Sequence, residues 1–551
     1  MAYAGDPDNP AGDILQEYEY LKQSRSTWES QWNDIAELIV PRRADFINKD
    51  APVPGNERRS KIYDSTPVRA VSRFASGMHN ILTPAAAPWF LLKPRLRALQ
   101  ENREVNLWLD EATHYIQEYL SRPQSNFHPA VYEYYVDLGA FGTSVMFIED
   151  IPGSGPLFRN FPLSDCVLAT DNLGQIDTVF RLHKQTAKAL IEQFPPEQLS
   201  EKVTKSMEAG KPYETFDCIH VVKPWHSLKP SGLQAIEKPW VSLHILKDEK
   251  MIMGVGGYDQ FPYVCSRWSR NALEIYGRGP GGDALPDIRM LNEMEKTYLK
   301  GLQKQVDPAL SLPDDGFISP LKTYPGALNF HRTGFSSADM IAELPTGEVR
   351  YADMKMGQVR ESIDKSFYLD LMELPGPMAP DGDVMRFTAT EIAMRQRDRL
   401  IILGPIVARQ EAEFLSPLIE RTFILMVRAG LMPPPPQVMQ EMDIMVEYVN
   451  PVSVSMRSVE LNAISQLIQF IMPLAQVDPM AIERLNISRI TELGAEILRA
   501  PASAIRTNEE MEEIMKARQE QMAAQQEMMM AQTMSGVDKE TAEAEKARRL
   551  N

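Results

Sequence analysis

Two stretches decide the fold: PDIRMLNEMEKTYLKGLQKQV at residues 286–306 and ADMKMGQVRESIDKSFYLDLMEL at residues 352–374. Each has apolar side chains at helical spacing and so predicts a helix with one apolar stripe. The stripes are Ile288, Leu291, Tyr298 and Leu302 in the first helix, and Met356, Val359, Ile363, Phe367 and Leu371 in the second. Neither helix can bury its stripe alone. At about 1.5 Å per residue each helix is roughly 30 Å long, which suits a wall element better than a connector.

Composition limits what such a wall can belong to. The chain has 551 residues, of which 44% are apolar and 24% charged, as expected of a soluble protein with about three to four domains. It has no basic-then-apolar leader and no run of apolar residues long enough to cross a bilayer, which predicts a cytoplasmic protein by default. The net charge of -17 argues against tight nonspecific DNA binding, although it allows a surface past which DNA slides.

The sequence offers no catalytic or metal-binding pattern. Cys166, Cys218 and Cys265 are odd in number and lack CxxC spacing, so we expect buried, idle thiols without disulfides or zinc. The eight histidines include no HExxH, and no GxSxG elbow occurs. The run Gly277–Gly282 lacks the lysine and hydroxyl of a phosphate-binding loop, and we interpret it as a hinge. We therefore predict no catalytic residue, no metal and no cofactor.

The N-terminal region is predicted to be helical. Apolar residues recur at helical spacing in four segments, which are residues 13–40, 67–82, 102–121 and 128–141. Pro41 ends the first of these helices, and Phe90–Pro94 can be extended.

Short strands follow over residues 143–264, because segments rich in β-branched and aromatic residues alternate with turn signals. Asp171–Gly174 predicts a hairpin turn, and a short helix at 188–193 interrupts the strands. The region reads as an antiparallel β unit on a helical base, so the fold class is α+β, predominantly α.

The C-terminal part is again helical. Thr388 and Glu391 have capping-box spacing and start a helix predicted to run toward Gly430, with bends at Pro405 and Pro417. Residues 433–436 are four prolines and form a boundary. Beyond it we expect helices at 461–474 and 480–498. The tail from Thr507 is rich in Met, Gln, Glu and Ala, which suits either a helix or a partly disordered segment.

Four motifs in a fixed order resemble those of one family. They are FASGMHNILTP at 74–84, NLGQIDTVFR at 172–181, FPYVCSRWSR at 261–270 and EIYGRGP at 274–280, the last followed by a long helix. This series is similar to the head-to-tail connecting, or portal, proteins of short-tailed bacteriophages, over roughly residues 16–436. Each motif alone is moderately specific, and the ordered series is much more so.

The resemblance implies a structural protein and no enzyme. It implies a homo-oligomeric ring of about twelve subunits with a central channel at one capsid vertex, through which double-stranded DNA is packaged and ejected. The implied partners are the terminase large subunit, a tail adaptor protein, and the major capsid and scaffolding proteins, with no membrane. The implied location is the virion, after assembly in the host cytoplasm.

The resemblance also implies a division of the subunit into named parts. These are the wing (1–286), stem helix 1 (287–305), the clip (306–351), stem helix 2 (352–374), a tunnel loop (375–387), a long wing helix (388–432), the crown (433–500) and a C-terminal tail (501–551). The tail would be either a helix of a ring-wide barrel or partly disordered outside an assembly. Five prolines between 308 and 345 exclude a long helix from the clip. Its short apolar pieces, 309–312 and 348–351, can pair with a neighbouring subunit.

Candidate DNA-contacting residues lie on stem helix 1 and in the tunnel loop. Lys296, Lys300 and Lys304 are spaced four apart and so follow one helix face. They form either a basic stripe inside the channel or a solvated face balanced by Glu293 and Glu295.

The remaining candidates come from the implied parts. In and beside the tunnel loop they are Pro375, Gly376, Pro377, Met378, Asp381 and Arg386, the last as a cation close to DNA. Arg395, Arg397 and Arg399 fit intersubunit or surface pairing better than DNA contact. For docking of partners at the clip the candidates are Phe317, Tyr324, Phe330, His331 and Arg332.

Two other classes stay open at this point. One is another virion protein that forms rings or tubes, and the other is a nucleic-acid-processing enzyme such as a nuclease, with an unrecognised carboxylate site.

Overall fold

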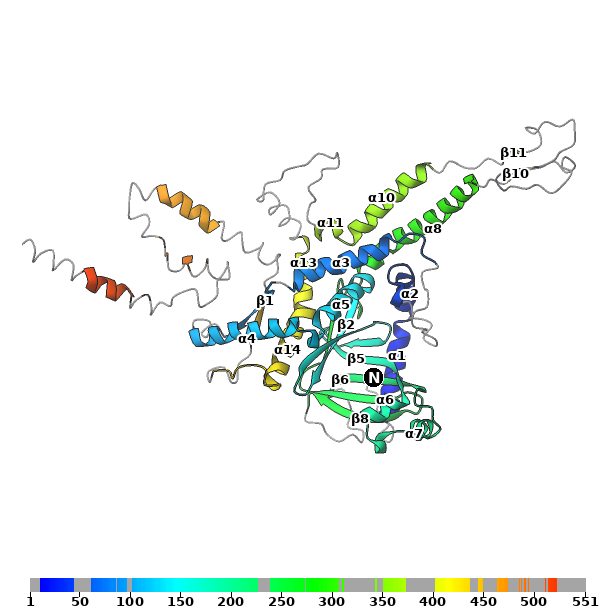
Figure 1. Ribbon diagram of the computed structural model, residues 1–551, viewed down its shortest axis with the longest axis horizontal. Coiled ribbons are helices and arrows are strands. Elements are labelled where there is room, and N and C mark those ends of the chain that lie inside the picture. The colour runs from blue at the N-terminus through cyan, green and yellow to red at the C-terminus, as the bar shows by residue number, and fades with distance from the viewer. Residues whose placement is uncertain are drawn as a thin grey trace, which may run out of the picture. The chain divides into compact units, whose positions relative to one another are not determined.

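The structure is a computed structural model (Figure 1). It describes residues 10–43, 61–85, 87–96, 102–225, 238–272, 274–306, 310–311, 342–343, 350–372, 402–436, 444–448, 463–473 and 514–522, and six single positions between 485 and 511. The chain divides into two compact units, the first made of residues 1–93, 112–434 and 444–456, the second of 94–111, 435–443 and 457–551. The contacts described below lie within the first unit.

Helices begin the first unit, with one departure from the prediction. The segment predicted as one helix over 13–40 is two, α1 (Pro10–Ser24) and α2 (Ser26–Leu38), separated at Arg25. The Arg25 side chain is buried and donates to the carbonyl oxygens of Leu163, Ser164 and Cys166, so the break places a cation against them. The other predicted elements are confirmed as α3 (Thr66–Leu82), β1 (Phe90–Pro94), α4 (Arg103–Ser121) and α5 (Phe127–Phe141).

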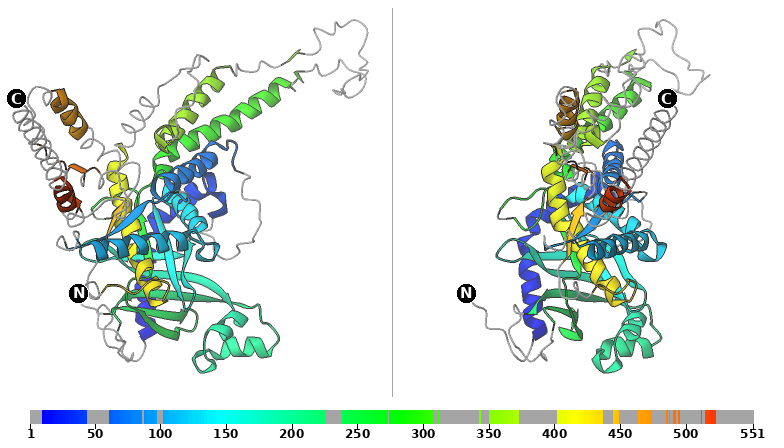
Figure 2. Two further views of the ribbon diagram at one scale, coloured as in Figure 1. Left: turned by 60° about the vertical axis from the view of Figure 1, so that its left-hand side comes forward. Right: turned by 90° about the vertical axis from the view of Figure 1, so that its left-hand side faces the viewer.

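The predicted β unit is two antiparallel sheets (Figure 2). The three-stranded sheet has the order β3-β2-β9, with β2 (Thr143–Ile151), β3 (Gly155–Phe161) and β9 (Tyr263–Arg267), so strands continue past the expected end at Val264. The five-stranded sheet runs in chain order through β4 (Cys166–Thr170), β5 (Ile176–Thr186), β6 (Thr215–Pro224), β7 (Trp240–Leu246) and β8 (Met251–Tyr258). The strand pattern was correct, but period-2 alternation does not say which strands share a sheet.

Helices cover both faces of the five-stranded sheet. One face packs against α1 through Ile14, Leu15 and Tyr18. Part of the other face packs against α6 (Ala187–Gln193) and α7 (Glu201–Glu208). The short helix α6 was predicted. The helix α7 was not, because its eight residues contain too few apolar positions to show a period.

The predicted hairpin turn between β4 and β5 is confirmed. Gly174 has φ of 78°, and the Asp171 carboxylate accepts the backbone N–H groups of Leu173 and Gln175.

The two long helices lie side by side, as the paired stripes predict (Figures 1 and 2). We call α8 (Pro280–Val306) and α10 (Arg350–Ser366) the helix pair. Most of both stripes is buried, whereas Tyr298, Leu302 and Leu371 are half-buried.

Two details of the helix pair correct the prediction. First, α8 starts at Pro280, so Gly281 and Gly282 lie in its first turn and are not a hinge. A Cβ on Gly281 would come within 2.6 Å of the Ala140 carbonyl oxygen, so this glycine lets the helix start pack on α5.

Second, the helix predicted at 352–374 is interrupted at Phe367 and Tyr368, and α11 (Leu369–Met372) follows. Tyr368 has φ of 57°, which an α-helix does not permit. The break lets the Phe367 ring contact Phe74 and the Tyr368 ring contact Trp268.

Further along the chain, the long helix predicted from 388 lies outside the described residues until 402. The described part consists of α13 (Gly404–Gln410), a π-helical turn (Glu411–Leu415) and α14 (Ser416–Arg428). The helix is therefore irregular at the π-helical turn and not at the two prolines where bends were predicted. Pro405 and Pro417 sit near the starts of α13 and α14, where proline is tolerated.

Short elements complete the description. β10 (Leu310–Ser311) pairs with β11 (Ala342–Glu343) of the same chain, and β12 (Ile444–Tyr448) pairs with β1. Helical residues 463–473 fall inside the helix predicted at 461–474, and 514–522 are helical within the tail. Most of the helix predicted at 480–498 lies outside the described residues. Among the described helices, none is long and apolar enough to cross a membrane.

Candidate functional site

The outer part of α8 carries unbalanced positive charge. From Lys296 to Val306 this segment, which we call the lysine tip, has three lysines and no carboxylate. Lys296 Nζ lies 3.2 Å from Glu293 Oε1. Lys300 and Lys304 are exposed, and the described part of the chain gives neither of them an ion-pair partner. The balance by Glu293 and Glu295 therefore holds for Lys296 only, since Glu295 pairs with Arg360 at 3.1 Å.

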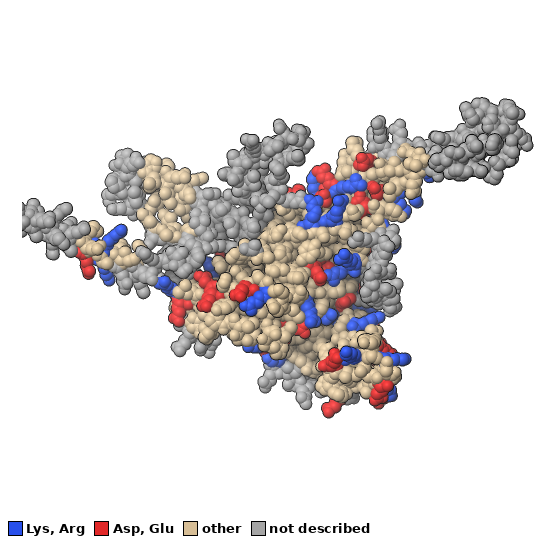
Figure 3. All heavy atoms as spheres, in the orientation of Figure 1, with Lys and Arg blue, Asp and Glu red and all other residues tan. Residues whose placement is uncertain are grey.

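The base of the helix pair is held by paired charges. Arg360 of α10 donates to Asp64 at 2.8 Å as well as to Glu295. Burial acts to raise the pKa of Asp64, but hydrogen bonds from Thr66 and Arg360 outweigh it and lower that pKa. On the face shown in Figure 3, basic and acidic side chains lie side by side where the helix pair joins the rest of its unit. The charged side chains at the base of the helix pair therefore form ion pairs with one another within the chain.

Hydrogen bonds with residues 61–63 also hold the base of the helix pair. The backbone N–H of Tyr63 donates to Asn292 Oδ1 at 2.8 Å, and Asn292 Nδ2 donates to the Lys61 carbonyl oxygen at 2.9 Å. Ser362 of α10 donates to the Asp287 carboxylate of α8 at 2.8 Å. These contacts hold α8 against residues 61–63 and against α10.

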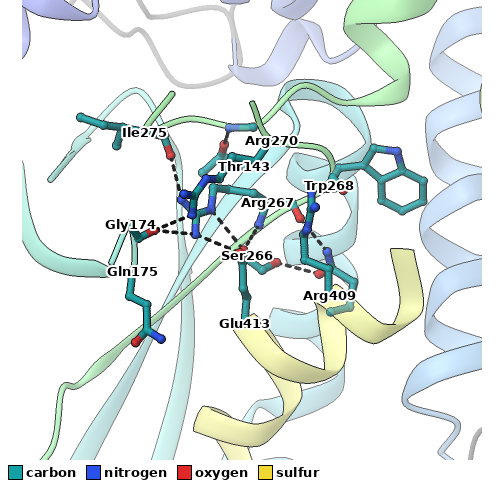
Figure 4. A network of polar contacts seen from close by, with 12 residues as sticks. Thr143, Gly174, Gln175, Ser266, Arg267, Trp268, Arg270, Ile275, Arg409 and Glu413 are labelled. Carbon is teal, nitrogen blue, oxygen red and sulfur yellow. Dashed lines mark hydrogen bonds and ion pairs between the residues drawn. The ribbon is translucent and has the colours of Figure 1, made fainter. Parts of the chain in front are cut away.

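A buried polar network, which we call the junction, ties the strands to the π-helical turn (Figure 4). Its centre is Arg267 at the end of β9, whose side chain is 3% exposed. Arg267 Nη2 lies 2.9 Å from Glu413 Oε1, and the Arg267 backbone N–H donates to Glu413 Oε2 at 2.9 Å. The guanidinium also donates to the Gly174 and Ile275 carbonyl oxygens, at 3.1 and 3.5 Å. A single buried cation thus joins four segments of the chain.

Gln410 completes the junction. Its Nε2 donates to the Arg267 carbonyl oxygen at 3.0 Å, and its Oε1 accepts from the Ser266 hydroxyl at 2.7 Å. The Tyr134 hydroxyl of α5 in turn donates to Ser266 Oγ at 2.7 Å. A π-helical turn widens the helix by one residue. Here it falls where Gln410 and Glu413 both reach β9.

Glycines let the backbone pack closely beside the junction. Gly142 has φ of 77°, and a Cβ there would lie 2.3 Å from the backbone of Arg278. A Cβ on Gly277 or Gly279 would likewise come within 2.7 Å of Gly142. The glycines that we interpreted as a hinge from the sequence therefore allow two backbone segments to cross closely.

The four motifs meet in this region. Phe74, from the first motif, packs its ring on Trp268 of the third at a centroid distance of 5.1 Å. Gly174 is in the second motif, Arg267 in the third, and Ile275 and Gly277 in the fourth. The motifs therefore build the packing that anchors the helix pair.

Several predicted site residues cannot be compared with the structure. The tunnel-loop candidates, Arg386, the arginines at 395, 397 and 399, and the clip candidates all lie outside the described residues. Conversely, sequence reasoning missed Arg360, Gln410 and Glu413. In the sequence they read as polar positions of amphipathic helices, and no spacing rule reveals their distant partners.

The three cysteines are buried among the described residues. All three thiols are free and buried, as predicted. Burial raises the pKa of Cys218 to about 12 and that of Cys265 well above its usual value, which suppresses thiolate chemistry. Over the same described residues, no three His, Cys, Asp or Glu side chains are grouped to hold a metal ion.

Comparison with known proteins points to one family. The family model described as bacteriophage head to tail connecting protein matches residues 11–505. The chain is 29% identical over 520 residues to a probable portal protein of Bordetella phage BPP-1, covering 92% of this chain and 91% of the relative. It is 26% identical over 517 residues to a portal protein of Salmonella phage epsilon15, again covering 92% and 91%.

Proposed function

The chain belongs to the family of bacteriophage head to tail connecting proteins, and we propose that it forms a closed ring of about twelve copies around a channel for double-stranded DNA. As a portal-type connector it is a structural component of the virion, which joins capsid and tail. In this proposal the ring occupies one capsid vertex, and DNA passes through it during packaging and ejection.

The observation that carries the proposal is the contrast between the lysine tip and the rest of the chain. The chain as a whole has a net charge of -17, so a ring of copies repels DNA over most of its surface. Lys300 and Lys304 are exposed cations on a helix segment without carboxylates. Repeated around a ring, they would form bands of positive charge that guide phosphates without holding them tightly.

The proposed parts follow the family resemblance. Residues 1–286 and 388–432 would be wing, 287–305 and 352–374 stem, 306–351 clip, 375–387 tunnel loop, 433–500 crown and 501–551 tail. The terminase large subunit, and later a tail adaptor, would dock at the clip. The tunnel loop would contact DNA and resist its backward slippage. Major capsid and scaffolding proteins would surround the ring, which would assemble in the host cytoplasm.

Electron microscopy of the purified protein tests the ring. Two-dimensional class averages should show closed rings of about twelve subunits with an open channel. A compact monomer in the presence and absence of scaffolding protein would contradict the proposal. Rings located away from the capsid vertex in assembled particles would favour a different virion ring protein.

A matched pair of variants tests the lysine tip. The variant K296A/K300A/K304A should form rings but package less DNA per particle, or eject it with altered kinetics. The control K188A/K202A/K205A removes the same charge from exposed helical lysines on α6 and α7. Packaged DNA can be measured by quantitative amplification from purified capsids. Equal DNA content together with equal ejection kinetics in the two variants would remove the guiding role from the lysine tip.

A further inference from the structure

A row of basic side chains crosses one face of the five-stranded sheet, away from the helix pair. The strand register places Arg181 of β5 opposite His220 of β6, and His220 opposite His244 of β7. His183 lies two residues after Arg181 on β5 and so shares its face. The rings of His220 and His244 stack with centroids 4.4 Å apart. We call these four residues the histidine row.

The histidine row forms contacts between the two sheets. His220 Nδ1 lies 2.9 Å from the Tyr263 hydroxyl on β9, and the Arg181 guanidinium lies 3.5 Å from the centre of the Phe161 ring on β3. The His220 ring also lies perpendicular to the Phe147 ring of β2, with centroids 5.9 Å apart. A change of charge within the row would therefore act on the contact between the sheets.

The groups around the row leave its positive charge uncompensated. Burial lowers the pKa of His183 and of His244 to about 4, and that of His220 well below its usual value. Arg181 lowers the pKa of all three histidines further, and neighbouring histidines lower those of His183 and His220, whereas a backbone hydrogen bond with Arg181 acts to raise the pKa of His183. The titratable side chains beside the row are Cys166 of β4, which is opposite Arg181, Cys218 of β6, which is opposite His183, and Tyr263 of β9. Its other neighbours are Ser242, Phe147, Phe161 and Phe194. At neutral pH none of these carries a negative charge.

We propose that the histidine row is an acid-sensitive latch, in which protonation of His183, His220 and His244 beside Arg181 releases the five-stranded sheet from the three-stranded sheet. The β4–β5 turn should act as the pivot, because the Gly174 carbonyl oxygen accepts from both Arg267 and Arg270 in the junction. The helix pair is held by separate contacts and keeps its place. The inference concerns the isolated subunit as well as any assembly, so it does not rest on the proposed function.

The direction of the pH effect follows from linkage. The histidines are neutral when the sheets are closed, and once exposed they titrate near 6.5. The open form therefore takes up protons as pH falls from about 6.5 toward about 4, and each histidine raises the opening constant by up to tenfold per pH unit. For three histidines acting together, the logarithm of the opening constant rises by up to about three for each unit by which the pH falls. We call this change per pH unit the slope.

Hydrogen exchange on the full-length chain measures this slope. Once released, the five-stranded sheet loses the packing of the three-stranded sheet on its face, and its strands should then open locally more often. Opening constants of β5, β6 and β7, corrected for intrinsic exchange rates, should therefore rise between pH 6.5 and pH 4.5 while α3 and α5 stay protected. In the variant H183Q/H244Q the slope should fall by about two, because two of the three proton-binding groups are gone. The control H114Q removes an exposed histidine of α4 and should leave the slope unchanged.

Two results would overturn the latch. One is a slope in H183Q/H244Q equal to that of the unmodified chain. The other is acid opening of α3 and α5 with the same slope as β5–β7, which would be global unfolding. If the double variant does not fold at neutral pH, H244Q alone replaces it. His244 is half-buried, and its replacement should lower the slope by about one.

Discussion

The junction and the lysine tip both contain cations, but the cation of the junction is buried and paired, whereas those of the lysine tip are exposed. In the junction, Arg267 is buried and its guanidinium meets a carboxylate and two carbonyl oxygens of the same chain. At the lysine tip, Lys300 and Lys304 are exposed, and the described residues offer them no carboxylate. Burying an unpaired charge costs several kcal/mol, so a buried cation must find its partners inside the subunit. An exposed one is free to meet something outside it.

The largest effect should come from separating the buried pair. Replacing Glu413 by Leu leaves Arg267 buried without its carboxylate, which should cost about 3–5 kcal/mol of unfolding free energy. The double variant R267M/E413L should recover part of this loss, since no unpaired charge remains. Denaturant unfolding followed by tryptophan fluorescence measures both.

The exposed pair of Arg278 and Glu274 provides the control for that experiment. The two residues are four positions apart in the non-helical segment before α8, and R278A should cost less than about 1 kcal/mol. If E413L were no more destabilising than R278A, the buried pair would not hold the junction together.

The next effect should come from the glycine crossing beside the junction. Substituting Ala at Gly142 forces a side chain into positive φ and against the Arg278 backbone, which should cost about 2 kcal/mol or more. Gly210 is a matched control, because its φ is 72° but a Cβ there meets nothing within 4 Å. G210A should cost only the backbone strain, about 1 kcal/mol. Equal losses in the two variants would show that close approach is unimportant.

A smaller effect should come from the base of the helix pair, which is intermediate between the two regions. Arg360 is about one-third exposed and donates to both Asp64 and Glu295. R360A should cost about 1 kcal/mol at neutral pH, after allowance for screening by solvent.

The pH dependence of that loss gives a second reading. Because the pKa of Asp64 is lowered in the folded chain, its contribution is present above the usual value of 3.8 and disappears as pH falls through the lowered one. The stability difference between the unmodified chain and R360A should shrink over that acid range. A difference independent of pH would mean that Asp64 is not the partner that matters.

The smallest effect on stability should come from the lysine tip itself. K300A/K304A should change the unfolding free energy by no more than about 0.5 kcal/mol, because exposed side chains without partners contribute little to folding. The same unfolding assay applies. A loss as large as that of R360A would break the comparison, since it would mean that these lysines have partners within the chain.

Periodicity explains which parts of the fold could be predicted. The apolar stripes gave both members of the helix pair, and alternation with turn residues gave the strands β2–β8 and the Asp171–Gly174 turn. The helix interruptions at Arg25 and Tyr368 were not predicted, because both residues are compatible with a helix. Each break instead allows a contact with a residue distant in the sequence. Arg25 reaches carbonyl oxygens near β4, and Tyr368 reaches Trp268.

The sequence by itself determined most of the helices and strands, the overall negative charge and the ordered motifs that mark the family. These depend on local spacing and composition, which are legible along the chain. Only the tertiary structure decided that the strands form two sheets, that Arg267 meets Glu413, and that Arg181 and three histidines share one row. Such pairings join residues tens to hundreds of positions apart. They are fixed by burial and packing of the whole unit, and no local pattern encodes them.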